Sequence, residues 1–138
     1  MSSVPPSDRI AFDAFLGLEI LEQSPDRMRG RIDVADSHKQ PYGLVHGGVL
    51  ASIAESLASI GTSLAAAESG NVAVGMSNNT NFLRPILDGG IHADAQPRHR
   101  GRTTWIWDVD ITDDAGRLCA MSRVTIAVRP PPSGPGRR

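Results

Sequence analysis

One helix-forming segment constrains this 138-residue sequence more than any other feature. From Val49 to about Glu68 the chain contains no proline, six alanines and a single interior glycine. Large aliphatic residues recur there at steps of three and four, which places them on one helix face: Leu50, Ile53, Leu57, Ile60 and Leu64. The segment predicts one long core helix.

The other apolar residues follow the two-residue period of β-strands. After the helix they alternate with polar residues near 72–76, 91–98, 105–111 and 118–128. Before it, apolar runs at 18–22 and 28–34 flank a turn sequence at 24–26 and predict a hairpin. We also expect Ser7 to cap a short helix that carries Phe12, Phe15 and Leu16. The order predicts an α+β fold in which four strands after the helix form an antiparallel meander.

Two tryptophans that must be buried bear on the expected oligomeric state. Trp105 and Trp107 point to the same side of their strand, and a single helix covers only one face of a sheet. The uncovered face must be polar or must pack on another chain. We therefore expect a homo-oligomer.

Composition limits the size and the class of the protein. A mass of 14.7 kDa predicts one domain over residues 1–138, with proline-containing ends at 1–6 and 130–138 as flexible tails. A net charge of −1 and 4% aromatic residues argue against nucleic-acid binding. We expect no signal peptide, no membrane span and a cytoplasmic location, because one cysteine, Cys119, suits a reducing compartment.

The start of the long helix offers backbone donors. Its first turn leaves N–H groups unpaired and carries about half a positive charge, so a polarised carbonyl placed there is stabilised. Gly47 and Gly48 would let a substrate approach closely. The same glycines also suit a tight turn into the helix, and their spacing alone does not separate the two interpretations.

Glu55 is the second candidate group. It lies opposite the aliphatic stripe and shares its predicted face with Ser59 and Thr62, so it is either a reactive carboxylate or part of a solvated polar face. Eight residues separate it from Gly47, about 12 Å along a helix, whereas a reacting carbonyl must lie about 3 Å from both groups. If both act in one reaction, they come from different subunits.

Three motifs together resemble a known family. They are Gly43-Leu-Val-His-Gly-Gly48, Ala54-Glu55-Ser56 and Asn81-Phe-Leu-Arg-Pro85. They are similar to hotdog-fold acyl-coenzyme A (CoA) thioesterases of the phenylacetic-acid-degradation type, and more narrowly to 4-hydroxybenzoyl-CoA thioesterases with a helix glutamate. The stretch from Gln40 to Gly48 also resembles 1,4-dihydroxy-2-naphthoyl-CoA thioesterases. The resemblance implies a sheet wrapped around a central helix, and a tetramer built as a dimer of dimers with shared active sites.

The resemblance also implies roles for individual residues. Glu55 matches the catalytic carboxylate, which acts as nucleophile or as general base, and Gly47 matches the amide that polarises the thioester carbonyl. His46 and Gln40 match positions that orient substrate or water, and Ser59 stands where the family more often has threonine. Substrate-binding positions are carried over to Gly48, Thr103 and Thr104.

Arginines supply the expected contacts to the phosphates of CoA. The tract 98–102 is a dense positive cluster, and together with Arg84 it leads us to expect that Arg84, Arg100 and Arg102 bind the nucleotide end. A solvated strand end is the alternative. Arg102 departs from the small serine of the related enzymes. The four histidines lack metal-ligand spacing, so we expect no metal and no cofactor besides the CoA of the substrate.

The expected reaction is hydrolysis of an aromatic, 4-hydroxybenzoyl-like acyl-CoA. 1,4-Dihydroxy-2-naphthoyl-CoA and phenylacetyl-CoA are alternative substrates. Hydration of an enoyl thioester on the same fold is disfavoured, because Glu55, Gly47 and the family resemblance together support hydrolysis. A non-catalytic acyl-CoA binding protein is the last alternative, and the intact Glu55 argues against it.

Overall fold

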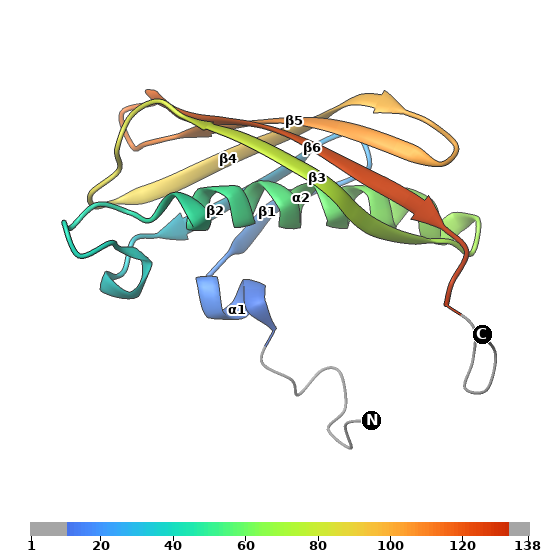
Figure 1. The fold of residues 1–138 in the computed structure, drawn as a ribbon, viewed down its shortest axis with the longest axis horizontal. Coiled ribbons are helices and arrows are strands. Elements are labelled where there is room, and N and C mark those ends of the chain that lie inside the picture. The colour runs from blue at the N-terminus through green and yellow to red at the C-terminus, as the bar shows by residue number, and fades with distance from the viewer. Residues whose placement is uncertain (1–10, 133–138) are drawn as a thin grey trace, which may run out of the picture.

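A computed structural model describes residues 11–132, which form one antiparallel sheet around a long helix. Figure 1 shows the sheet on one side of α2 and the short α1 on the other. The elements are α1 Phe12–Leu16, β1 Glu19–Gln23, β2 Met28–Asp33, the 3₁₀ turn η2 Asp36–His38, α2 Gly47–Glu68, β3 Val72–Phe82, β4 Gly90–Arg100, β5 Thr104–Thr112 and β6 Leu118–Arg129. The expected α+β hotdog architecture is confirmed.

Strand order departs from the predicted meander at one strand. The order is β1-β2-β4-β5-β6-β3, so β4, β5 and β6 do form a meander. β3, however, pairs with β6 at the far edge, and β4 pairs with β2 instead. The prediction that β3 joins β4 is therefore wrong, since alternation identifies a strand and its faces but does not encode its neighbour. The arrangement leaves β1 and β3 as the two edges.

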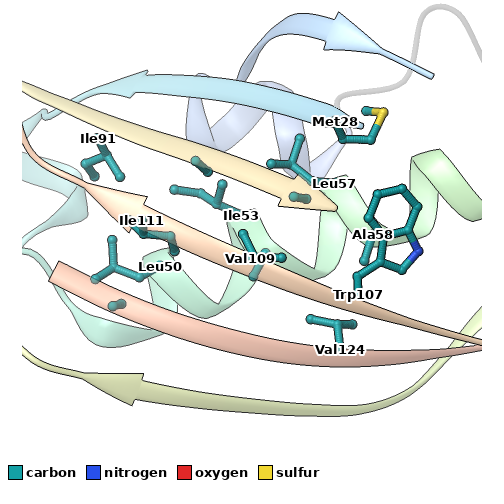
Figure 2. Close-up of a cluster of buried hydrophobic side chains, with 14 of the residues drawn as sticks. Met28, Leu50, Ile53, Leu57, Ala58, Ile91, Trp107, Val109, Ile111 and Val124 are labelled. Atoms are coloured by element: carbon teal, nitrogen blue, oxygen red, sulfur yellow. The ribbon is translucent and has the colours of Figure 1, made fainter. Parts of the chain in front are cut away.

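The buried face of α2 is wider than the aliphatic stripe predicts. Leu50, Ile53 and Leu57 are buried as expected, whereas Ile60 and Leu64 are only partly buried. Small residues complete the buried face: Ala54, Ala58, Gly61, Thr62 and Ala66. They let the helix lie close to inward side chains of the sheet, among them Ile91, Val109, Ile111 and Val124 (Figure 2).

Both tryptophans are buried within the chain. Trp107 is fully buried against α2, and its indole Nε1–H donates to Thr62 Oγ1 at 2.9 Å. Trp105 is 8% exposed and stacks on Trp107 with ring centroids 6.1 Å apart. The expectation that these residues need a partner chain is therefore wrong. The opposite face of the sheet is largely polar and includes the Asp108–Arg123 ion pair at 2.9 Å.

The ends of the chain fall largely outside the described residues. Ser7 and the predicted tail 1–6 lie there, and the N-cap of α1 is Ala11, whose side chain makes no capping bond. α2 is long and apolar enough to span a membrane by length and composition alone, with mean hydropathy 1.4 over 18 residues. It packs against the sheet, however, as the core helix of this fold.

We predict that Gly61→Ala destabilises the protein. A Cβ at Gly61 would overlap the Trp107 ring, so the overpacking should lower the free energy of unfolding by about 1–3 kcal/mol. The same change at an open helix site would instead stabilise by about 1 kcal/mol. Urea unfolding with Ser63→Ala, an exposed site on the same helix, as control measures the effect. Unchanged or raised stability would contradict this packing.

Candidate active site

The loop before α2 is held by backbone hydrogen bonds. Gln40 N–H donates to Leu44 O at 2.7 Å, and Gly43 takes a positive φ of 91° inside this turn. His46 N–H then donates to His38 O at 2.8 Å. These bonds fix the direction in which the chain enters the helix.

His46 caps α2 and leaves one amide free. Its Nδ1 accepts the Gly48 N–H at 2.8 Å, and its carbonyl accepts the Val49 N–H at 3.0 Å. Within residues 11–132, the Gly47 N–H has no hydrogen-bond acceptor. The Gly48 amide, predicted to bind substrate, is therefore already occupied, and Gly47 is the glycine that presents a donor. The exposed His46 has a structural role here in addition to the predicted one.

A groove of about 440 Å³ adjoins Gly47. Gln40, Gly47 and Arg84, three residues predicted for the site, line it together with Phe82. Gly47 lies directly against this ring, since an added Cβ would be 2.8 Å from Phe82 Cε1. The structure thus gathers an amide donor, a carboxamide and a guanidinium at the start of α2.

Glu55 lies in a second groove, of about 290 Å³. Its carboxylate is exposed, with Oε1 3.5 Å from Asn78 Nδ2, which donates to Ala51 O at 2.9 Å. On the same strand, a Cβ at Gly75 would be 3.4 Å from Glu55 Oε2. Ser59 lines this groove as predicted. A carboxylate flanked by an amide and a hydroxyl can attack a carbonyl or orient a water.

Thr62 does not belong to the Glu55 face. It is fully buried, donates to Ala58 O at 2.8 Å and accepts from Trp107. The predicted grouping of Thr62 with Glu55 is wrong, because the buried face of α2 extends further around the helix than the stripe of large aliphatic residues predicts.

The predicted arginine cluster is divided between the two ends of the molecule. Arg84 lies beside the start of α2, whereas Arg100, Arg102, Thr103 and Thr104 lie at the β4–β5 turn, at the end where α2 finishes (Figure 1). The Arg100 guanidinium pairs with Asp26 at 2.5 Å and lies 5.6 Å from the Trp105 ring centre, so its contacts are structural. Arg84 and Arg102 are exposed and form no ion pair within residues 11–132.

Sequence reasoning missed three groups around Glu55: Phe12, Asp13 and Asn78. Asn78 belongs to a polar run, Ser77–Asn81, which hid the second half of β3 because asparagine is rare in strands. That unusual run was the available signal. The short helix α1 was predicted, but no sequence pattern placed Phe12 and Asp13 beside Glu55, because the contact of α1 with α2 depends on the tertiary fold.

Other titratable groups have structural roles. Cys119 is buried, and burial raises the pKa of its thiol, as suits a packing residue. His38 Nδ1 accepts the Ala35 N–H at 2.9 Å, so its Nε2–H donates to Leu16 O at 2.9 Å. Between residues 11 and 132, no three His, Cys, Asp or Glu side chains gather as metal ligands.

The chain is similar in sequence and in structure to known proteins of one superfamily. The model of the thioesterase superfamily matches residues 42–120, which include Gly47 and Glu55. Rv1847 of Mycobacterium tuberculosis is 39% identical over 127 residues, 91% of each chain, and its structure aligns with a TM-score of 0.84 over 88% of this chain and 98% of that one.

Two further relatives agree. The 1,4-dihydroxy-2-naphthoyl-CoA hydrolase of Escherichia coli is 33% identical over 114 residues, 83% of each chain. The structure of a variant of thioesterase PA1618 from Pseudomonas aeruginosa aligns with a TM-score of 0.85 and 32% identity, over 91% of this chain and 90% of that one. The chain therefore belongs to the thioesterase superfamily and is a thioester hydrolase of the hotdog fold.

Proposed function

We propose that this protein hydrolyses an aromatic, 4-hydroxybenzoyl-like acyl-CoA to the free acid and CoA, at sites shared between two subunits. One observation carries the proposal. Along β3, Phe82 lies against Gly47 and Gly75 lies against Glu55, so the strand holds the two reactive groups at opposite ends. β3 is also an edge of the sheet, where its outer backbone groups are open to another strand.

Antiparallel pairing of two β3 edges would complete the site. If Gly75 of one chain faces Phe82 of the other, the two-fold axis passes near Asn78 and Asn79. Each Glu55 then lies opposite the partner's Gly47. The pairing brings together the carboxylate and the amide that about 12 Å of helix keeps apart in one chain.

Exposed apolar side chains on and beside β3 support this edge as the contact. Val74, Met76, Phe82 and Leu83 are each between 51% and 58% exposed in the single chain. A long edge strand with such side chains is a surface that proteins normally cover. We retain the prediction that two such dimers form a tetramer, and the prediction of a cytoplasmic location.

The chemistry follows from these positions. The Gly47 N–H donates to the thioester carbonyl oxygen and stabilises the negative charge that develops there. The Glu55 carboxylate can attack the carbonyl carbon, so that the CoA thiolate leaves and water then hydrolyses the mixed anhydride to the free acid and the regenerated carboxylate. Alternatively it takes a proton from a water that attacks the carbonyl carbon, and the CoA thiolate leaves as the free acid forms. Asn78 and Ser59 orient the carboxylate or the water, and Gln40 lies beside the carbonyl.

Positive charge for the CoA phosphates comes from two places in this arrangement. Arg84 lies beside Gly47, and the two-fold would bring the β4–β5 turn of the other chain, with Arg102, Thr103 and Thr104, to the same end of the dimer. Arg102 is the better candidate of the turn, because Asp26 and Trp105 already hold Arg100.

The aromatic acyl group is supported by the E. coli relative, which is a 1,4-dihydroxy-2-naphthoyl-CoA hydrolase. 1,4-Dihydroxy-2-naphthoyl-CoA and phenylacetyl-CoA remain the alternative substrates. Binding of acyl-CoA without turnover is the remaining alternative function, and an exposed carboxylate beside Asn78 favours catalysis over it.

We predict that Glu55→Gln lowers kcat for 4-hydroxybenzoyl-CoA by about 10²–10⁴-fold, because the amide is neither nucleophile nor base. CoA affinity should change less than about threefold, since Glu55 acts in the chemical step. Thiol release from 4-hydroxybenzoyl-, phenylacetyl-, 1,4-dihydroxy-2-naphthoyl- and medium-chain acyl-CoA measures both rate and acyl class. Glu68→Gln, exposed at the end of the same helix, is the control. Near wild-type turnover by Glu55→Gln would remove Glu55 from the mechanism.

A pair of substitutions tests the Gly47 amide. Gly47→Ala adds a Cβ beside Phe82 and keeps the N–H, whereas Gly47→Pro adds a ring there and removes the N–H at a helix position that accepts proline. Loss of one oxyanion donor costs about 10²–10³ in kcat, so the proline variant should be slower than the alanine variant by that factor. Equal kcat values would show that this amide does not act on the carbonyl.

A further inference from the structure

α1 is held beside α2 by a buried side chain and by two hydrogen bonds, one to η2 and one to α2. The Leu16 side chain is buried, and Leu16 O accepts the Nε2–H of the buried His38 at 2.9 Å. One turn earlier, Ser56 Oγ–H donates to Asp13 Oδ1 at 2.5 Å. Ser56 directly follows Glu55, so this bond fixes α1 beside the carboxylate.

The same helix presents two phenylalanines to solvent. Phe12 is 58% exposed and Phe15 is 67% exposed, and their rings stack with centroids 6.4 Å apart. These contacts therefore hold two aromatic rings outside the core, although burial of a phenylalanine side chain stabilises a fold. Exposed apolar side chains that gather beside a groove mark a site for a ligand or for a partner.

Phe12 lies between two adjacent grooves. It lines the Glu55 groove, and it also lines a groove of about 360 Å³ that Phe15, Leu16 and Val49 make largely apolar. The two grooves share Phe12 and Ser52. A ligand whose reacting carbon lies at Glu55 can thus extend over Phe12 into an apolar space of the size of a small-molecule site.

We propose that α1 forms the wall of the acyl subsite, with Phe12 stacking on the aromatic ring of the acyl group. The Asp13–Ser56 hydrogen bond positions Phe12 and does not touch the reacting atoms. This inference rests on the proposed function and adds to it the residues that select the acyl group. Stacking on Phe12 favours an acyl group that carries an aromatic ring over one that does not.

A second protein copy fits this patch less well than an acyl group. Two partly exposed rings on one helical turn present about 300 Å² at most, whereas a stable interface takes about 800 Å² from each partner. Polar residues, among them Ser37, Lys39 and Ser52, surround the rings. A small aromatic group matches the patch in size and in chemistry.

The first test compares the substrate with CoA itself, which lacks the acyl group. In Phe12→Ala, kcat/KM for 4-hydroxybenzoyl-CoA should fall about tenfold, while the inhibition constant of CoA stays within about twofold. Phe12→Leu keeps an apolar side chain on α1 and should show a smaller fall in the same direction. Leu21→Ala, an exposed apolar site on the opposite edge strand, should change neither value.

The second test addresses the positioning bond. Ser56→Ala should lower kcat/KM and leave the inhibition constant of CoA unchanged, and Ser56→Thr, which keeps a hydroxyl, should retain the wild-type values. The double variant Phe12→Ala/Ser56→Ala should lose no more than Phe12→Ala alone, because both act through the same ring. Additive losses would overturn the positioning role.

Several outcomes would overturn the subsite. Equal weakening of CoA and substrate by Phe12→Ala, or no change in either, would show that Phe12 does not contact the acyl group. If Phe12→Ala changes the molecular mass of the protein in solution and leaves kcat/KM unchanged, the two rings belong to a subunit contact and not to the acyl subsite. If one of these results is found while the wild-type protein hydrolyses the substrate and Glu55→Gln does not, the subsite is overturned and the proposed function stands. Absence of wild-type turnover for the whole acyl-CoA panel would overturn both.

Discussion

The rise of the central helix separates Gly47 from Glu55 by about 12 Å along the helix axis in one chain. No thioester carbonyl can contact the amide and the carboxylate of one chain at that separation. Both residues lie within the regular helix α2, so the separation is fixed. The same rigid spacing becomes useful when two helices run in opposite directions. Each helix then gives an amide to one site and a carboxylate to the other, which is why the unpaired edge of β3 matters for function.

Close packing between α2 and the sheet maintains that geometry. Ala54, Ala58 and Gly61 let the sheet approach the helix, and the Trp107 ring fills the space over Gly61 while its N–H satisfies Thr62. At the beginning of the helix, His46 takes the Gly48 amide and leaves the Gly47 amide free. Core packing and capping therefore prepare a donor and a carboxylate at fixed positions before any substrate arrives.

Local patterns were predictable from the sequence, and long-range pairings were not. The spacing of Leu50, Ile53 and Leu57 identified α2, and the helix rise implied a shared site. The position of β3 beside β6, the burial of Trp105 and Trp107 within one chain, and the contact of Arg100 with Asp26 depend on strand order, which alternation does not contain. Asn78 and Asp13 reach the Glu55 groove only through the tertiary fold.

Subunit complementation tests the shared site most directly. Glu55→Gln and Gly47→Pro chains should each be nearly inactive alone, and co-expression should place one intact site in every mixed dimer. Random pairing makes about half of the dimers mixed, so activity should return to about a quarter of the wild-type value. Activity no greater than the sum of the two separate variants would contradict the account, because it would place both groups of each site in one chain.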